Sequence, residues 1–584
     1  MEFSNDGNSI FHRFQAAFVH DGQGKLLYCT GPQKRRVQEH WELIDRHLPS
    51  RSHMATSESQ KVGSADLQEA LRGSRLYETR RPGSAPMGLI LDATSQSNNT
   101  SSTQFEGFFA QLLLDQADFA IRDPGLMTKS PSGASLAVTH QIVDLFDSFL
   151  RYQGKDDRWE VGGKARFAER VRHFTSQNAV IDLCLPAFPC KSSNTNKVLG
   201  KAPDRGERLA LERLHGFVEA IEKVYQPGAK LWVISDGHVF SDCIGVDDAD
   251  VDMYGEQLKE MNHAIGVSRG NTGRVGFRSL VDLFELDKAD SQHKLSALQA
   301  QLNIPDIEHH VKTRLTAEAE LCRQILMAGC QPQESAVRAK IKSQNAAILA
   351  LYRGFSRFML EDLELHPHTQ QLTRSQRKKL SSKVAFEMIM RNQSYSNLVE
   401  LLLPNHVRLS IHAHNNAGPK FGIQLFDPAV VRAVEGLSPD GTPMTSRDLL
   451  HIPTPWHNCV VEVEGSPHLL VTKASVPREA ISLGGVTGEV AVGDAPCFVL
   501  RPKSGGGGGG GVAAVEKAEG RKESTPVAVA SKPSPVPMPA PAQKQRAPKS
   551  RRRKQLDWAR RLAAFPVICW LGMVFYHRVV EAFV

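Results

Sequence analysis

Two runs of sequence decide the fold, Ala179-Val180-Ile181-Asp182-Leu183-Cys184-Leu185 and Lys230-Leu231-Trp232-Val233-Ile234-Ser235. The first run is apolar on both faces of an extended chain, which is typical of a strand inside a parallel sheet. Between the two runs, Asp204 and Glu207 have the spacing of a capping box, so we expect a helix that begins there and ends at Pro227-Gly228. A strand, a helix and a second strand in this order form a βαβ unit. The sequence therefore predicts an α/β fold.

The βαβ unit lies inside a longer stretch, residues 135–500, that is expected to form one ordered domain. Good helix formers and many charged residues fill 282–403, which predicts a helical insertion. Strand patterns return after the insertion, and the last two are expected to pair as a hairpin: 407–412, 421–425, 458–463 and 468–472.

Both flanks of this domain differ from it in composition. Residues 1–134 are dense in Ser, Asn, Gln and Arg over 53–103, so we expect a mostly disordered N-terminal extension, with the apolar stretch 105–114 docked on the domain as a helix. Residues 501–555 contain seven consecutive glycines and many prolines, which predicts a low-complexity, Gly/Pro-rich basic linker. Residues 556–584 are expected to form a hydrophobic C-terminal helix.

The composition excludes several classes of protein. Of 584 residues, 41% are hydrophobic and 23% are charged, which excludes a wholly disordered, collagen-like or disulfide-framework chain. The nine cysteines are scattered without CxxC pairs, which indicates reduced thiols and a cytoplasmic location. Residues 501–584 carry 16 Lys and Arg against 5 Asp and Glu, or +11, so residues 1–500 carry −3 of the net charge of +8. Nucleic-acid binding by the domain is therefore not expected.

The C-terminal helix is a candidate membrane anchor. Residues 562–576 are fifteen residues without a charge, or about 22 Å of helix, which is shorter than the ~30 Å hydrocarbon core. The basic groups at 551–554 and at Arg560-Arg561 favour a flank facing anionic lipid, so one interpretation is a tail anchor or an interfacial helix. The alternative is a helix that docks on a partner protein, and 551–554 alone also matches a nuclear signal.

Three polar clusters follow predicted strands, at the places where open α/β sheets bind ligands. The first cluster consists of Lys191, Ser192, Ser193, Asn194, Lys197 and Arg205. Hydroxyls, amides and cations in such a loop can bind a phosphate group, although the sequence lacks the GxxxxGK[ST] pattern of a Walker loop. The alternative is a solvated loop whose Ser and Asn side chains only satisfy turns.

The second cluster contains Asp236, His238 and Asp242. Two carboxylates that flank one histidine suit proton transfer, because a carboxylate orients and polarises the imidazole. The alternative is an ordinary strand-to-helix turn in which Asp236 caps the helix. The acidic residues that follow, at 247–252, are interpreted as a solvated loop because they lack the spacing of a calcium-binding EF-hand.

The third cluster follows the strand pattern after the insertion. Alternation places Arg408, His412 and His414 on one face, with Lys420 farther along the chain. Two histidines on one face could ligate a metal ion, with His457 as a third imidazole. Hydrogen-bonding or acid–base histidines are the favoured interpretation, so no metal ion is expected.

Five segments together make the chain recognisable: FPCKSSN (188–194), PDRGE (203–207), SDGHVFSD (235–242), RLSIH (408–412) and PTPWHN (453–458). In this order they resemble the isocyanide synthase family, which is the pyoverdine/dityrosine biosynthesis family of bacteria and fungi. The resemblance spans about 135–500 and leaves the N-terminal extension and the tail outside.

The resemblance implies a Rossmann-like α/β enzyme with a mixed sheet and with no metal or redox cofactor. Such enzymes join the α-amine of tyrosine, tryptophan or an aliphatic amino acid to the ketone of a co-substrate, ribulose 5-phosphate. The sugar phosphate fragments and leaves its carbonyl carbon on nitrogen as an isonitrile, used in secondary metabolism; in the dityrosine branch the product is N-formyl-tyrosine for a spore wall. A separate iron/2-oxoglutarate oxygenase, or another tailoring enzyme, is the partner that the resemblance implies.

The resemblance also implies roles for the three clusters. Proton transfer is expected from Asp236, His238 and Asp242, with His412 or His457 as a second acid or base. The phosphate is expected at Ser192, Ser193, Asn194, Lys197 and Arg205, and the substrate carboxylate at Arg408 or Lys420. Lys191 is expected to bind the phosphate or the ketone oxygen, or to form a Schiff base. Two other functions stay open: a catalytically silent, membrane-tethered binding module of the same fold, and another enzyme that transforms amino acids or sugar phosphates.

Overall fold

The structure is a computed structural model, and the residues that it describes lie in the first of two units of the chain, Met1–Gly506 and Gly507–Val584. The described residues are 16–20, 26–29, 75–79, 87–92, 105, 108–109, 112–113, 133–152, 156–284, 302, 304–403, 405–412, 415–438, 441–444 and 453–503. The predicted linker at 501–555, beyond Lys503, and the predicted C-terminal helix at 556–584 lie outside the described residues.

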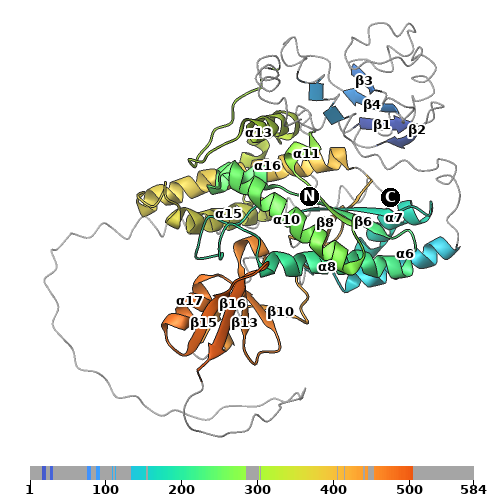
Figure 1. Ribbon diagram of the computed structural model, residues 1–584. Coiled ribbons are helices and arrows are strands. Elements are labelled where there is room, and N and C mark those ends of the chain that lie inside the picture. Colours follow the sequence, from blue (N-terminus) through green and yellow to red (C-terminus); the bar gives the residue numbers. More distant parts are fainter. Residues whose placement is uncertain are drawn as a thin grey trace, which may run out of the picture. The chain divides into compact units, whose positions relative to one another are not determined.

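A five-stranded parallel sheet forms the centre of the described domain (Figure 1). Its order is β7-β6-β5-β8-β9, with the bounds Val275–Arg278, Ala229–Ile234, Ile181–Pro186, Val407–Ser410 and Lys420–Gly422. The first of these strands along the chain, β5, is central, with β6 and β7 on one side and β8 and β9 on the other. This is the doubly wound order of Rossmann-like folds, whose ligands bind where the order reverses, here between β5 and β8.

Every described pairing within this sheet is parallel. The predicted α/β fold is therefore confirmed, and the predicted mixed sheet is wrong for the central sheet. The physical reason lies in the connection 411–419, which returns the chain to the same end of β8, so that β9 runs parallel to β8 and does not form a hairpin with it.

Helix α8, Arg205–Val224, connects β5 to β6 and confirms the predicted βαβ unit. Asp204 Oδ1 accepts the N–H of Gly206 at 2.7 Å, and the N–H of Asp204 donates to Glu207 Oε2 at 2.9 Å, so the predicted capping box is present. The apolar face of α8 is buried in the main core, at Leu211, Leu214, Phe217, Val218 and Ile221. This face packs α8 against β6 and β7.

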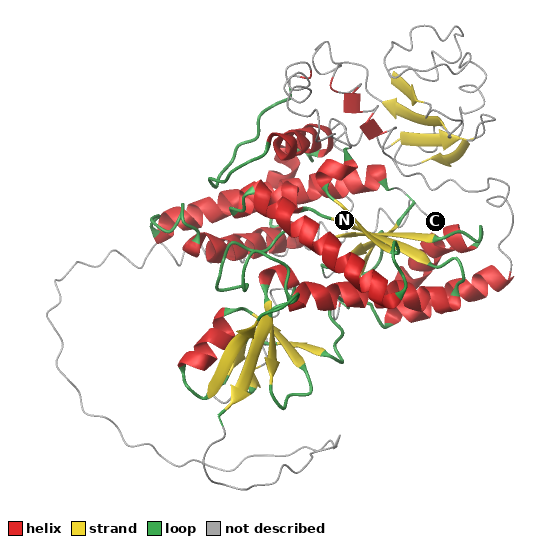
Figure 2. Ribbon diagram, viewed as in Figure 1, coloured by secondary structure: helices red, strands yellow, loops and turns green. Residues whose placement is uncertain are grey.

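Further helices lie around and beyond the sheet (Figure 2). They include α6 (Gly133–Asp147), α7 (Lys164–Thr175), α9 (Gly237–Ile244), α10 (Asp248–Arg269) and α11 (Leu280–Leu283), with a π-helical turn at Trp159–Gly163. The predicted helical insertion is confirmed and consists of α13 (Ala317–Cys330), α14 (Glu334–Lys342), α15 (Ala346–Leu365) and α16 (Arg374–Leu402). Helix α16 packs against α9, α13 and α15, which brings the insertion next to the turn after β6.

A second five-stranded sheet follows the central one along the chain. Its order is β10-β14-β13-β16-β15, with the bounds Val431–Ala433, Leu469–Thr472, Cys459–Val463, Cys497–Pro502 and Val486–Ala491. It mixes parallel and antiparallel pairs, and the predicted hairpin is confirmed because β13 and β14 pair antiparallel. The remaining elements here are α17 (Ser475–Ser482), the 3-10 turn Pro455–His457, and the pair β11 (Gly436–Leu437) and β12 (Pro443–Met444).

Four strands lie in the N-terminal extension, β1 (Ala16–His20), β2 (Leu26–Cys29), β3 (Arg75–Thr79) and β4 (Met87–Asp92), in an antiparallel sheet of order β2-β1-β4-β3. The prediction of a mostly disordered extension is wrong for these four segments, because short apolar runs form strands despite the polar composition around them. The predicted docking of 105–114 is confirmed at the helical residues Phe105, Phe109, Leu112 and Leu113, which are buried in the main core.

No helix among the described residues is long and apolar enough to cross a bilayer. The candidate anchor at 556–584 lies outside those residues and stays a prediction. Seven cysteines are described, and all are buried free thiols, which agrees with the predicted reduced state.

A buried ion pair joins α13 to α10. Arg323 donates to both carboxylate oxygens of Asp248, from Nη1 to Oδ1 at 3.0 Å and from Nη2 to Oδ2 at 2.9 Å, and also donates to the carbonyl of His238 at 3.0 Å. Both side chains are inaccessible to solvent. The expectation of a solvated loop at 247–252 is therefore wrong for Asp248, whose charge Arg323 neutralises inside the protein.

Replacing Arg323 with Met should destabilise the fold by about 3–5 kcal/mol, because the Asp248 carboxylate would stay buried without its partner. Urea unfolding followed by circular dichroism measures this loss. The control is Arg338→Met, because Arg338 pairs with Glu334 on the exposed surface of α14 and should contribute less than ~1 kcal/mol. Equal losses in the two variants would contradict the structural role of the buried pair.

Candidate active site

Lys191 holds three of the sequence motifs together inside the protein. Its Nζ lies 2.8 Å from Asp204 Oδ2 and 2.8 Å from Glu207 Oε2, and it donates to the carbonyl of Pro455 at 2.9 Å. Burial alone would lower the pKa of Lys191, but the two carboxylates outweigh burial and raise that pKa. Burial raises the pKa of Glu207 to about 7, and Tyr254 donates to Glu207 Oε1 at 3.0 Å. Lys191 is thus a fully paired cation, and its predicted catalytic role gains no support from this geometry.

The rest of the predicted phosphate loop docks on the end of α15. Lys197 Nζ lies 2.8 Å from Asp362 Oδ1 and 3.5 Å from Glu361 Oε2. Ser192 Oγ donates to Asp362 at 3.2 Å, and the Asn194 amide donates to the carbonyl of Glu361 at 3.1 Å. Carboxylates therefore already neutralise both lysines of this loop. Two predicted phosphate ligands are left at least partly open to solvent, Ser193 and Arg205.

Asp236 carries a carboxyl oxygen, Oδ1, that the described residues leave unsatisfied. It lies between β6 and α9, yet its side chain makes no capping hydrogen bond to the helix, so the alternative of an ordinary helix cap is wrong. Its Oδ1 is buried and has no hydrogen-bond partner among the described residues. Burial raises the pKa of Asp236 to about 7. A carboxyl group that is half protonated near neutral pH can both accept and donate protons, as general acid–base catalysis requires.

The other two members of the second cluster make separate contacts. His238 is buried, and its Nε2 lies 3.2 Å from Asp252 Oδ1. Asp242 Oδ1 accepts from Arg391 Nη1 at 2.5 Å, and its Oδ2 lies 2.8 Å from His309 Nδ1. Burial alone would raise the pKa of Asp242, but Arg391 and His309 hold it well below its usual range. Asp242 is therefore a charged anchor for α16, whereas Asp236 has the properties of a proton carrier.

Two cations of the third cluster lie side by side without an acidic partner. Arg408 in β8 and Lys420 in β9 are direct register partners, and both donate to Oγ of Ser396 in α16, at 3.0 and 2.7 Å. Neither forms an ion pair with a described residue. Burial, and then the charge of Arg408, lowers the pKa of Lys420 to about 7, and burial also lowers the pKa of Arg408. Uncompensated charges at this depth are costly, and an anionic ligand would relieve that cost.

His412 follows the end of β8 and borders these cations. The strand ends at Ser410, so the predicted alternation on one face stops there, and the side chain of His414 lies outside the described residues. His412 keeps an exposed surface although protein surrounds its ring. These surroundings, together with the charges of Lys420 and Arg151, lower the pKa of His412 to about 4, so the imidazole is neutral near pH 7.

His457 lies in the 3-10 turn that Lys191 holds. Its Nδ1 is 3.1 Å from Oγ1 of Thr454, and its ring packs edge-on against Phe358 with centroids 4.7 Å apart. The part of the chain that the structure describes contains no group of three or more His, Cys, Asp or Glu side chains that could hold a metal ion.

Tyr395 and Ser396 of α16 were not predicted, and they connect the acid to the cations. Burial raises the pKa of Tyr395 well above its usual value; the charge of Asp236 raises it further and that of Arg408 lowers it, so both charges act on this phenol. The Tyr395 hydroxyl donates to the carbonyl of Ile234, the last residue of β6, at 2.9 Å. The candidate site is therefore the region where α16 contacts β6, β8 and β9. No local pattern in α16 marks either residue, since only the fold brings them there.

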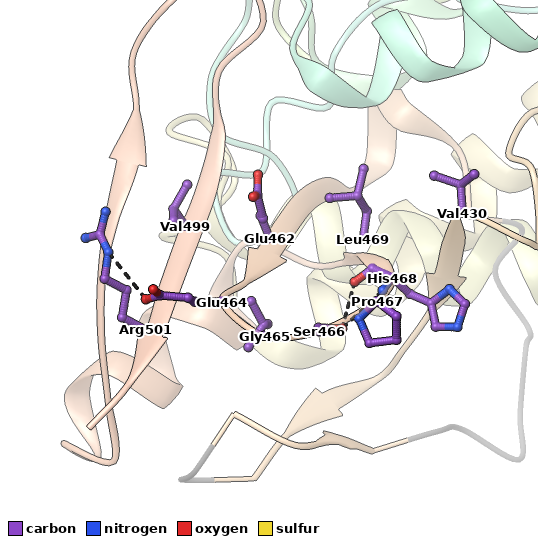
Figure 3. Close-up of a pocket in the computed structure, with 11 residues that line it drawn as sticks. Val430, Glu462, Glu464, Gly465, Ser466, Pro467, His468, Leu469, Val499 and Arg501 are labelled. Carbon is purple, nitrogen blue, oxygen red and sulfur yellow. Dashed lines mark hydrogen bonds and ion pairs between the residues drawn. The ribbon is translucent and has the colours of Figure 1, made fainter. Parts of the chain in front are cut away.

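Two pockets lie elsewhere in the described domain. Figure 3 shows a pocket on the second sheet, lined by Glu462, Glu464, His468, Arg501 and their neighbours, with a volume of about 410 Å³. The other, of about 910 Å³, lies between α13, α14, α15 and α16. Neither is lined by a predicted site residue, so neither supports the predicted chemistry.

The comparisons place this chain in a known family. Residues 171–484 match the family described as pyoverdine/dityrosine biosynthesis protein, and the chain belongs to this family. The chain is 41% identical to the spore wall maturation protein DIT1 of Saccharomyces cerevisiae over 409 residues, which cover 69% of this chain and 74% of DIT1. It is 30% identical to an L-tyrosine isonitrile synthase of Pseudomonas aeruginosa over 317 residues, or 54% of this chain and 78% of that relative.

Two further relatives come from bacteria. The L-tryptophan isonitrile synthase AmbI2 of Fischerella ambigua is 29% identical over 320 residues, which cover 54% of this chain and 78% of AmbI2. The crystal structure of the PvcA protein from Pseudomonas aeruginosa is similar over 62% of this chain and 99% of PvcA, with 27% identity and a TM-score of 0.46. The family relatives thus include isocyanide synthases, which supports an enzyme of this family.

The raised pKa of Asp236 makes stability depend on pH. Between about pH 4, the pKa of an unfolded aspartate, and about pH 7, the native state holds a proton that the unfolded state lacks, so this group opposes folding as the pH rises. Asp236→Asn should therefore unfold like the wild type at about pH 4 and be up to ~4 kcal/mol more stable at about pH 8. Urea unfolding at both pH values measures the difference.

Asp242→Asn is the matched control, with the opposite sign. Because the pKa of Asp242 is lowered in the native state, its charge stabilises the fold above the unfolded pKa, and this variant should lose stability near neutral pH. A loss of stability in Asp236→Asn at the higher pH would mean that the Asp236 carboxylate has a partner in solution.

Proposed function

We propose that this protein is an isonitrile synthase that converts the α-amino group of an aromatic amino acid, with ribulose 5-phosphate as the carbon donor. The observation that carries the proposal is the Asp236 carboxyl group after the end of β6, whose buried Oδ1 has no hydrogen-bond partner among the described residues and whose pKa is about 7. The names of two relatives, an L-tyrosine and an L-tryptophan isonitrile synthase, support an aromatic substrate, with tyrosine first. The free, buried thiols suit a cytoplasmic enzyme.

The reaction needs a group that moves protons in both directions. Attack of the amine on the ketone gives a carbinolamine, and loss of water from it needs an acid that protonates the departing hydroxyl. The later fragmentation needs a base that takes a proton from the sugar. A single carboxyl group titrating near pH 7 can serve first as the acid and then as the base, and we assign both steps to Asp236. We assign to His412 a hydrogen bond to the substrate, because its imidazole is neutral and accessible.

The silent binding module is the less favoured alternative. A binding module would have no use for a buried acid with an unsatisfied oxygen or for two adjacent cations without an acidic partner, since both lower the stability of the free protein. Such groups are expected where substrate contacts compensate for them.

The direct test incubates the purified full-length protein with ribulose 5-phosphate labelled with carbon-13 at the ketone carbon and with the standard amino acids. We expect one aromatic amino acid to yield an isonitrile that carries the label and reacts with a tetrazine probe. Mass spectrometry separates this product from an N-formyl amino acid, which would place the protein in the spore-wall branch with DIT1. Amino-acid consumption without label transfer would refute the proposed carbon donor.

Asp236→Asn should lower kcat by about 10²–10⁴-fold and leave the KM for the amino acid within a few-fold, because the amide keeps the shape but cannot exchange the proton. His238→Ala should also lose turnover while the protein stays folded. Glu256→Gln is the control, because this exposed carboxylate of α10 pairs with Lys259 and contacts no predicted site residue among the described ion pairs. A fully active Asp236→Asn variant would remove Asp236 from the mechanism.

A further inference from the structure

We propose that Arg408, Lys420 and Ser396 form the subsite for the phosphate group of the substrate, in place of the loop 191–205 that the sequence suggests. This inference rests on the proposed function only for the identity of the substrate. The subsite itself follows from hydrogen bonds, register and charge in the described residues. The ligand chemistry is a phosphate monoester, which carries two negative charges near neutral pH.

The backbone places the two cations on one face of the sheet. Arg408 and Lys420 are direct partners in the parallel pair of β8 and β9, so their side chains project on the same side. Helix α16 lies over that side, because Ser396 accepts hydrogen bonds from both cations. The three side chains therefore converge from two strands and one helix, with Arg408 inside β8 and Lys420 at the first residue of β9.

The Ser396 hydroxyl is left with one unused group, its proton. Arg408 Nη2 donates to Oγ at 3.0 Å and Lys420 Nζ donates to Oγ at 2.7 Å, so both lone pairs of this oxygen are occupied. The hydroxyl proton has no acceptor among the described residues. Arg408 is only 8% exposed, and its Nε is buried without a hydrogen-bond partner among the described residues. The Ser396 hydroxyl and Arg408 Nε are thus both available to donate hydrogen bonds to a ligand that binds beside them.

The charges favour a dianion at this place. Arg408 and Lys420 form no ion pair with a described residue, and Glu400, the acidic side chain whose charge reaches both, is exposed on α16. A phosphate monoester would neutralise both cations, whereas a carboxylate would neutralise one. The loop 191–205 is in the opposite state, because its two lysines already have carboxylate partners, Asp204 and Glu207 for one and Asp362 for the other.

The test measures binding of inorganic phosphate to the full-length protein, without turnover. Titration calorimetry at about pH 7, where Lys420 is still about half protonated and phosphate is partly a dianion, gives the affinity, and thermal unfolding with and without phosphate gives the stabilisation. We expect Arg408→Met and Lys420→Met to weaken phosphate binding by about 10–100-fold each, because each removes a charge-assisted hydrogen bond. Ser396→Ala should weaken it about 10-fold.

A purely structural role for Arg408 predicts a different outcome. If the guanidinium only supported the fold, Arg408→Met would lower the unfolding temperature in plain buffer. As an uncompensated cation it opposes folding, so the variant should unfold at the same or a higher temperature without phosphate and should lose the stabilisation that phosphate gives the wild type. Arg408→Lys, which keeps the charge, should retain part of that stabilisation. This variant shows whether phosphate binding depends on the charge or on the shape of the guanidinium group.

Two variants test the loop directly. Lys201→Met removes an exposed cation beside the loop, and Arg205→Met removes the half-buried predicted ligand at the start of α8. Both should bind phosphate as the wild type does. Loss of phosphate binding in Arg205→Met, with binding intact in Arg408→Met, would overturn the proposal and return the phosphate to the loop.

The carboxylate alternative is tested with the two substrates and with acetate. If Arg408→Met raises the KM for the amino acid and weakens acetate binding but leaves phosphate binding unchanged, the subsite binds the amino-acid carboxylate and the proposal is wrong. Failure of the proposed function looks different: the wild type would make no isonitrile, yet phosphate binding would still depend on Arg408 and Lys420. The proposed function and the proposed phosphate subsite are therefore tested by separate measurements.

Discussion

The buried charge of Lys191 is the constraint that joins three of the sequence motifs inside the protein. An ammonium group that is almost inaccessible to solvent is stable only beside opposite charge, and here Asp204 and Glu207 supply it while the carbonyl of Pro455 takes a further hydrogen bond. The chain after β5, the start of α8 and the turn that carries His457 must therefore meet at one point. Tyr254 of α10 extends the network through Glu207. The ion pairs and the hydrogen bond of Lys191 thus hold these motif residues in place before any ligand binds.

The same network explains which parts of the site the sequence could predict. The apolar runs and the capping box determine a βαβ unit locally, so the strands, the helix between them and the place of Asp236 follow from nearby residues. The partners of charged side chains do not follow from nearby residues. Lys197 looks like a free phosphate ligand because the carboxylate that neutralises it, Asp362, lies on α15, far along the chain. Ser396 could not be predicted either, because in the sequence it is only one more polar residue of a predicted helix.

The errors in the predicted fold have the same origin. Whether β9 pairs parallel or antiparallel to β8 depends on the path of 411–419, and no residue pattern encodes that path. Likewise, the polar average over 53–103 does not decide whether a run of five or six residues within it, such as β3 or β4, forms a strand. Pairing with a neighbour decides it, and pairing is a property of the fold. Local patterns fix elements, whereas register and charge compensation are tertiary.

Charge compensation separates the scaffold of this domain from its site. Arg323, Arg391 and Lys191 are buried, and each has a carboxylate, so removing any one leaves an unpaired charge and costs stability. By contrast, no partner of opposite charge among the described residues contacts Asp236, Arg408 or Lys420. Each of these three groups therefore destabilises the protein when no ligand is bound. A dianion held by Arg408 and Lys420 would raise the pKa of Lys420 and, through its negative charge, that of Asp236. The acid would then be protonated when the sugar phosphate is bound, which is the state that expulsion of water from the carbinolamine needs.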